Sequence, residues 1–112
     1  MPDQFWDEMR SAVQSKMEHF LSDLGAACFQ GDVFHYLIAS AGFIKAACLT
    51  LFCINKRFEP SHRAYFNQVR ELQILPGSFV GEFETFLENS PGTSMDSRFS
   101  LAMLIAKNIV AL

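Results

Sequence analysis

The fold of this chain is decided by the stretch DVFHYLIASAGFIKAACLTLFCINKRFEP, residues 32–60. Read as a helix, it places apolar side chains in nearly every direction, and only His35, Gly42 and Lys45 form a thin polar line. A helix that is apolar all round lies either at the centre of a helical core or inside a membrane. The choice between these environments settles the fold class.

The run from Val33 to Ile54 is long enough to span a bilayer. A central lysine such as Lys45, however, costs about 2.5–3.5 kcal/mol on insertion scales. The amphipathic helix predicted from about residue 3 to residue 29 also needs a partner for its apolar stripe. We therefore expect a central helix in a soluble bundle, not a membrane span. No positively charged segment precedes an early apolar run, which favours a cytoplasmic location.

Three more helices are predicted from the spacing of apolar residues and from the residues that begin and end helices. Gly31 and Asp32 close the first helix and cap the second, and Gly25 is expected to loosen the first before its end. Ser61 caps a third helix, 62–72, and Ser78 a fourth that ends near residue 88. A loop of Asn, Ser, Pro and Gly then leads to a fifth, from about residue 95 to the terminus. The expected buried side chains are Tyr65, Phe66, Val69 and Leu72 in the third helix, Phe79, Phe83, Phe86 and Leu87 in the fourth, and Phe99, Ala102, Met103, Ala106, Ile109 and Val110 in the fifth.

No stretch shows the alternation of apolar and polar residues that is typical of a β-strand. A chain of 112 residues is of the size of one domain. The sequence therefore predicts an all-α fold, a single-domain bundle of about five helices over residues 1–112. The second helix would be buried by the others. Twelve phenylalanines, which carry no polar edge, should be buried or form an interface.

The charge is unevenly distributed. The net charge is −3, yet residues 33–70 hold five bases and one acid. An acidic chain with one basic segment is a poor candidate for general nucleic-acid binding but is compatible with a local anion site. The three cysteines lie in apolar sequence, and buried reduced thiols are the simplest interpretation.

The first candidate site is the basic segment that follows the C-terminal end of the second helix. Lys56, Arg57, His62 and Arg63, with Arg70 further on, could gather around a phosphate or carboxylate, and the start of the third helix would point free amides toward it. The alternative is that these bases are solvated and only offset the negative end of the helix.

Arg57 and His62 also resemble the arginine–histidine motif of HEPN ribonucleases, which are small helical bundles. That resemblance implies acid–base chemistry by the histidine and phosphate stabilisation by the arginine, completed by dimerisation. Pro60 interrupts the helix that carries the motif in that family.

Other chemistry is disfavoured. Cys48 and Cys53 are five residues apart, about 140° around a helix, and no CxxC or HxxxH pair accompanies them, so neither a metal nor another cofactor is expected. Glu82, Glu84 and Glu88 are interpreted as a solvated helix face. No nucleophile elbow or glycine-rich phosphate loop is present.

The segment Leu51–Arg63, followed by Leu72 and the turn Leu75–Pro76, is similar to the C-terminal helical domain of nucleotidyltransferase-fold proteins such as the aminoglycoside and lincosamide nucleotidyltransferases. In those domains a buried helix ends in a Leu-Phe-x-Leu-Asn-like exit, and an aromatic, a proline and a basic residue follow. Here Phe58 replaces a more usual tyrosine, and Arg63 a frequent lysine. The resemblance implies an accessory domain beside a catalytic domain that the partner or parent chain supplies.

The preferred functional hypothesis is therefore a helical accessory module that is not an enzyme on its own. It would bind an anionic, nucleotide-type ligand or a nucleotidyltransferase catalytic domain, through Asn55, Lys56, Arg57, His62 and Arg63, with Asn55 holding the bend. A ribonuclease that uses Arg57 and His62 is one alternative. A homodimer in which phenylalanine-rich faces meet is the other.

Overall fold

Five α-helices and no strand are found in a computed structural model of the protein, which describes residues 2–61, 63–88 and 94–112. This confirms the predicted all-α bundle. The helices are α1 (Asp3–Gln30), α2 (Val33–Ile54), α3 (Tyr65–Arg70), α4 (Phe79–Leu87) and α5 (Met95–Val110).

A tight turn joins α1 to α2. Gly31 adopts the left-handed conformation, with φ of 67°, and its N–H donates to the Cys28 carbonyl at 3.3 Å. The next N–H, that of Asp32, donates to the Ala27 carbonyl at 3.0 Å. The Asp32 carboxylate then accepts a hydrogen bond from the His35 N–H at 3.0 Å. One glycine and one aspartate therefore end α1 and begin α2, as the sequence predicted.

Two glycines let neighbouring helices approach closely. The Phe20 ring of α1 lies on Gly42 of α2, where an added Cβ would come within 2.4 Å of the ring. Phe99 of α5 lies in the same way on Gly25 of α1, at 2.7 Å from an added Cβ. The expected loosening of the first helix at Gly25 is wrong, because α1 continues without a break to Gln30. Both glycines provide room for a ring.

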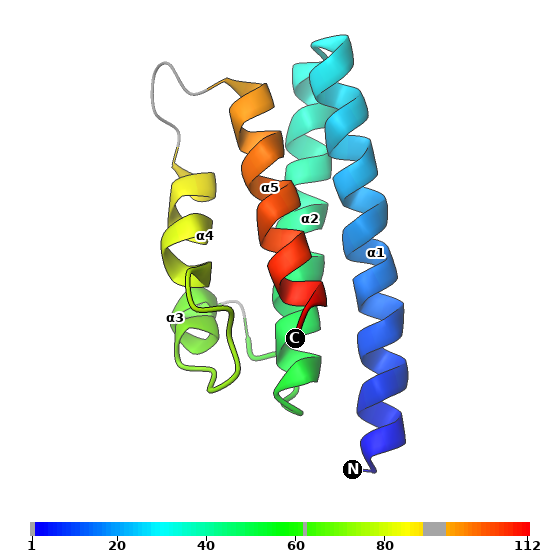
Figure 1. The fold of residues 1–112 in the computed structure, drawn as a ribbon, viewed down its shortest axis with the longest axis vertical. Coiled ribbons are helices and arrows are strands. Elements are labelled where there is room, and N and C mark those ends of the chain that lie inside the picture. The colour runs from blue at the N-terminus through cyan, green and yellow to red at the C-terminus, as the bar shows by residue number, and fades with distance from the viewer. Residues whose placement is uncertain (1, 62, 89–93) are drawn as a thin grey trace.

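Figure 1 shows α1 and α2 as a long antiparallel hairpin, with α5 beside them and α4 on the far side of α5 from α1. α3 is a short helix near the end of α2. One main core lies between the helices. Its largest fully buried side chains include Met17, Leu24, Phe43, Leu51, Phe52, Phe79, Phe83, Ile105 and Ile109.

The second helix is central, but its cover is incomplete. Most side chains of its C-terminal half are buried, whereas Phe34, Leu37 and Ile38 in its first half are 77%, 59% and 56% exposed. α2 is also the one helix in the described ranges that is long and apolar enough to cross a bilayer. Half of its most apolar 18-residue segment is buried inside the bundle.

Several details of the later helices differ from expectation. α3 begins at Tyr65, preceded by Ala64 in the left-handed conformation, so the predicted cap at Ser61 is wrong. Ser78 precedes α4, but its hydroxyl donates to the Glu82 carboxylate at 3.0 Å and accepts no backbone hydrogen bond within the described chain. The predicted burial was wrong for three side chains, which are exposed: Leu87, Met103 and Val110.

A glycine-to-alanine substitution inside a helix normally stabilises a protein, but the contact of Phe20 with Gly42 predicts that Gly42→Ala destabilises this one. Gly42→Ala should gain about 1 kcal/mol of helix propensity but lose about 1–3 kcal/mol to overpacking against the ring. We expect a net loss of about 1 kcal/mol in the free energy of unfolding, measured by urea denaturation.

Gly81→Ala is the matched control, because Gly81 lies inside α4 and an added Cβ there meets no atom within 4 Å. That variant should gain about 0.5–1 kcal/mol. Equal stabilisation by both substitutions would contradict the proposed role of Gly42.

Candidate binding pocket

The basic segment after α2 begins with a turn that ends the helix, at residues 55–57. After Asn55, the N–H of Lys56 donates to the Cys53 carbonyl at 3.0 Å, and that of Arg57 donates to the Phe52 carbonyl at 2.9 Å. This pair of bonds is the Schellman arrangement, in which the residue after the cap is left-handed and usually glycine. Here the position is occupied by Lys56, with φ of 55°. The turn satisfies carbonyls that would otherwise lack partners at the helix end.

Asn55 joins this turn to the connection between α3 and α4. Its side-chain amide donates to the Leu51 carbonyl at 2.8 Å and to the Ile74 carbonyl at 2.9 Å, and its oxygen accepts from the Ile74 N–H at 2.8 Å. The side chain therefore holds the bend by hydrogen bonds to the backbone, as expected for it. Its donors and its acceptor are all engaged within the protein.

The other residues of the predicted anion site are engaged elsewhere, exposed or outside the described residues. Lys56 forms an ion pair with Asp3 at 2.6 Å, which lowers the pKa of that carboxyl, whereas Arg57 and Arg63 are exposed. His62 lies outside the described residues, so its position relative to Arg57 is not defined. The helix N-terminus that was expected to point amides at an anion is not at Ser61, because α3 begins later.

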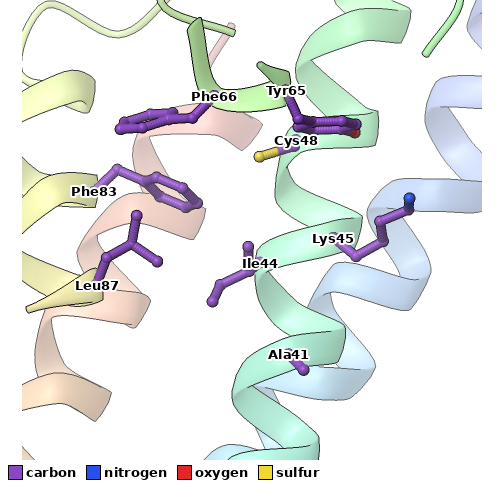
Figure 2. A pocket seen from close by; sticks show the side chains of 8 residues that line it. All are labelled: Ala41, Ile44, Lys45, Cys48, Tyr65, Phe66, Phe83 and Leu87. Atoms are coloured by element: carbon purple, nitrogen blue, oxygen red, sulfur yellow. The ribbon is translucent and has the colours of Figure 1, made fainter. Parts of the chain in front are cut away.

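A hollow lies elsewhere, between α2 and the pair α3–α4. It has a volume of about 390 Å³. Figure 2 shows two walls that face each other across it. Ala41, Ile44 and Cys48 of α2 form one wall, and the other comprises Phe66 of α3 with Phe83 and Leu87 of α4.

A network of polar groups lies at the rim of this pocket. The Lys45 ammonium contacts the Glu59 carboxylate at 2.9 Å and lies 5.3 Å from the centre of the Tyr65 ring. The Tyr65 hydroxyl donates to the other oxygen of Glu59 at 3.1 Å. Burial raises the pKa of Tyr65, so the phenol stays protonated and remains a donor. In Figure 2 the Lys45 ammonium points away from the hollow. The charge of Lys45 at the rim is therefore already neutralised by Glu59.

The thiol of Cys48 reaches into the same hollow (Figure 2). Burial raises the pKa of Cys48 to about 12, so the thiol stays protonated at neutral pH. A protonated thiol is neither a good nucleophile nor a metal ligand. Within the described ranges, no three side chains of histidine, cysteine, aspartate or glutamate are grouped to hold a metal ion. The pocket is therefore suited to apolar contact.

Sequence reasoning assigned the wall residues to the core and did not predict a pocket. Tyr65, Phe66 and Phe83 were identified as the inner sides of their helices, but the gap between those helices and α2 depends on tertiary placement. One local signal was present. Lys45 is a charge inside an otherwise apolar helix, and it marks the rim.

The hydrogen bonds of Asn55 predict a stability effect. Asn55→Ala removes three bonds to the backbone of α2 and of the α3–α4 connection. Because the site is partly open to water, we expect a loss of about 1–3 kcal/mol in the free energy of unfolding.

The control is Asn67→Ala, at an exposed position inside α3. It should change stability by less than about 0.5 kcal/mol. Urea denaturation measures both variants, and equal small effects would show that the Asn55 hydrogen bonds contribute nothing to the fold.

Comparison with protein-family models, with curated proteins and with solved structures finds no match to this chain. The similarity to the helical domain of nucleotidyltransferases and the similarity to HEPN ribonucleases therefore remain predictions from the sequence.

Proposed function

We propose that this chain is a non-catalytic helical binding module that recognises a protein partner by taking one of its apolar side chains into the pocket between α2 and α3–α4. The observation that carries the proposal is the pocket itself. It is a preformed hollow of about 390 Å³ with aliphatic and aromatic walls. Concave apolar sites with few polar groups are the usual form of binding pockets.

The rim chemistry favours an apolar occupant over an anion. An anionic ligand would need a cation with unused charge, but Lys45 is 2.9 Å from the Glu59 carboxylate. Glu59 in turn is held by Tyr65. An apolar side chain leaves this network intact, and its burial is worth roughly 1.5–3 kcal/mol.

The resemblance of Leu51–Arg63 suggests a narrower form of the proposal, in which the partner is a catalytic domain of the nucleotidyltransferase type. The Asn55 hydrogen bonds are compatible with an accessory role, since they fix one wall of the pocket relative to α2. Arg57 and Arg63 remain exposed beside the bend and are available to acidic groups of the same partner.

The pocket predicts binding of an isolated apolar side chain. N-acetylphenylalanine amide, followed by amide NMR shifts, should perturb Ile44, Cys48 and Phe83 with a dissociation constant of about millimolar order, as expected for so small a ligand. Ala41→Trp should abolish these shifts, because Ala41 is exposed at the pocket wall and a large ring there fills the space.

Ala12→Trp is the matched control, at an exposed alanine of α1 remote from the pocket. It should leave the shifts unchanged. Shifts that persist in Ala41→Trp, or that map outside the pocket, would overturn the proposal.

A further inference from the structure

Seven residues of α2 share one face. At 100° per residue, they fall within an arc of about 120° with Ala41 near its centre. This set, called the α2 face below, comprises Phe34, Leu37, Ile38, Ala41, Ile44, Lys45 and Cys48. The buried residues Tyr36, Ala39 and Phe43 lie on the opposite side of the helix.

The two halves of the α2 face differ in exposure. Before Ala41 the side chains of Phe34, Leu37 and Ile38 are each more than half exposed, Phe34 the most at 77%, although Leu37 also lines a smaller hollow with Phe86 and Leu87. After Ala41 the face is recessed, because Ile44 and Cys48 form a wall of the pocket opposite Phe66 and Phe83. Phe34 and Cys48 each lie seven residues from Ala41, which is about 10.5 Å along the helix axis.

We infer that a second copy of this chain occupies the pocket. Two α2 faces would cross antiparallel about a two-fold axis at Ala41, and Phe34 of each copy would enter the pocket of the other. In that register Phe34 meets Cys48 of the partner subunit, and Ile38 meets Ile44 of the partner subunit. The inference rests on the proposed function, because it names the side chain and the partner that use the same site.

The match in register argues for a second copy over a foreign protein. One helix carries both a protruding phenylalanine and a pocket that can hold it, at equal distances from a small residue. A two-fold axis pairs each protruding half with a recessed half and makes both contacts at once, which is the property of an isologous interface. Ala41 at the crossing point lets the two helix backbones approach closely.

The charges oppose a lipid bilayer as the occupant. No lysine or arginine lies between Met17 and Ile44, whereas surface helices that bind anionic lipid are rich in them. In the two-fold pair the one charge on the face, Lys45, keeps its own Glu59.

The exposed area suits a reversible dimer. A fully exposed aromatic side chain offers roughly 150–250 Å² and an aliphatic one less, so the exposed part of the α2 face and Leu87 comes to about 500 Å² per copy. Two copies would then bury on the order of 1000 Å², near the lower limit for a specific interface. We expect a dissociation constant in about the micromolar range, since the buried area is small.

Sedimentation equilibrium of the full chain, at concentrations that bracket this value, tests the inference. Phe34→Ala should raise the dimer dissociation constant at least about tenfold, because it removes the side chain that fills both pockets. Phe29→Ala is the matched control. Phe29 is 93% exposed near the end of α1, outside the α2 face, and its removal should change the constant less than about threefold.

A cysteine at the axis tests the geometry. Ala41→Cys places two thiols across the two-fold axis, and mild oxidation with diamide should give a disulfide-linked dimer. Ala12→Cys also presents an exposed thiol, on α1, and should form much less of the disulfide-linked dimer. Equal cross-linking of the two variants contradicts the antiparallel register.

The outcomes separate this inference from the proposed function. A chain that stays monomeric while N-acetylphenylalanine amide binds in the pocket overturns the dimer and leaves the proposed function standing. Failure of both overturns both. A dimer that Phe34→Ala and Ala41→Trp do not weaken, or an association only with lipid vesicles, also overturns the inference.

Discussion

The seating of the Phe20 ring on Gly42 sets how closely α1 and α2 approach, and the rest of the bundle is built on that pair. α5 packs against the hairpin, and α4 packs chiefly against α5. α1 and α5 both pack against α2, and the part of α2 that they leave open faces α3 and α4, which are too short to cover all of it. The exposed first half of α2 and the pocket beside its second half both follow from this mismatch in length.

Periodicity and capping predicted the elements because both are local. The turn at Gly31–Asp32 and the extent of α2 depend on residues within one helical turn of each boundary. The start of α3 was wrong because Ser61 looks like a cap, whereas the chain uses a left-handed Ala64. The prediction that Met103 and Val110 are buried was wrong for a different reason. Spacing tells which residues share a face, but the width of the covered arc is set by neighbouring helices.

The site was harder to predict than the fold. Charges near a helix end are conspicuous in a sequence, yet Lys56 is paired with Asp3 and Asn55 is hydrogen-bonded to the backbone. The bond between Asn55 and Ile74 joins segments 19 residues apart. The pocket likewise exists only because Phe66, Phe83 and Ile44 come from three helices whose relative positions no local pattern contains.

The hydrogen bonds between Asn55 and Ile74 also have a consequence for how the α3–α4 segment is held. They fasten the α3–α4 connection to the end of α2, while no hydrogen bond joins α4 itself to α2 among the residues that the structure describes. Apolar contacts are non-directional and permit small sliding motions. The α3–α4 segment is therefore fastened to α2 by hydrogen bonds at one end only, and along α4 its position depends on the buried rings of Phe79, Phe83 and Phe86 and on the packing of α4 against α5.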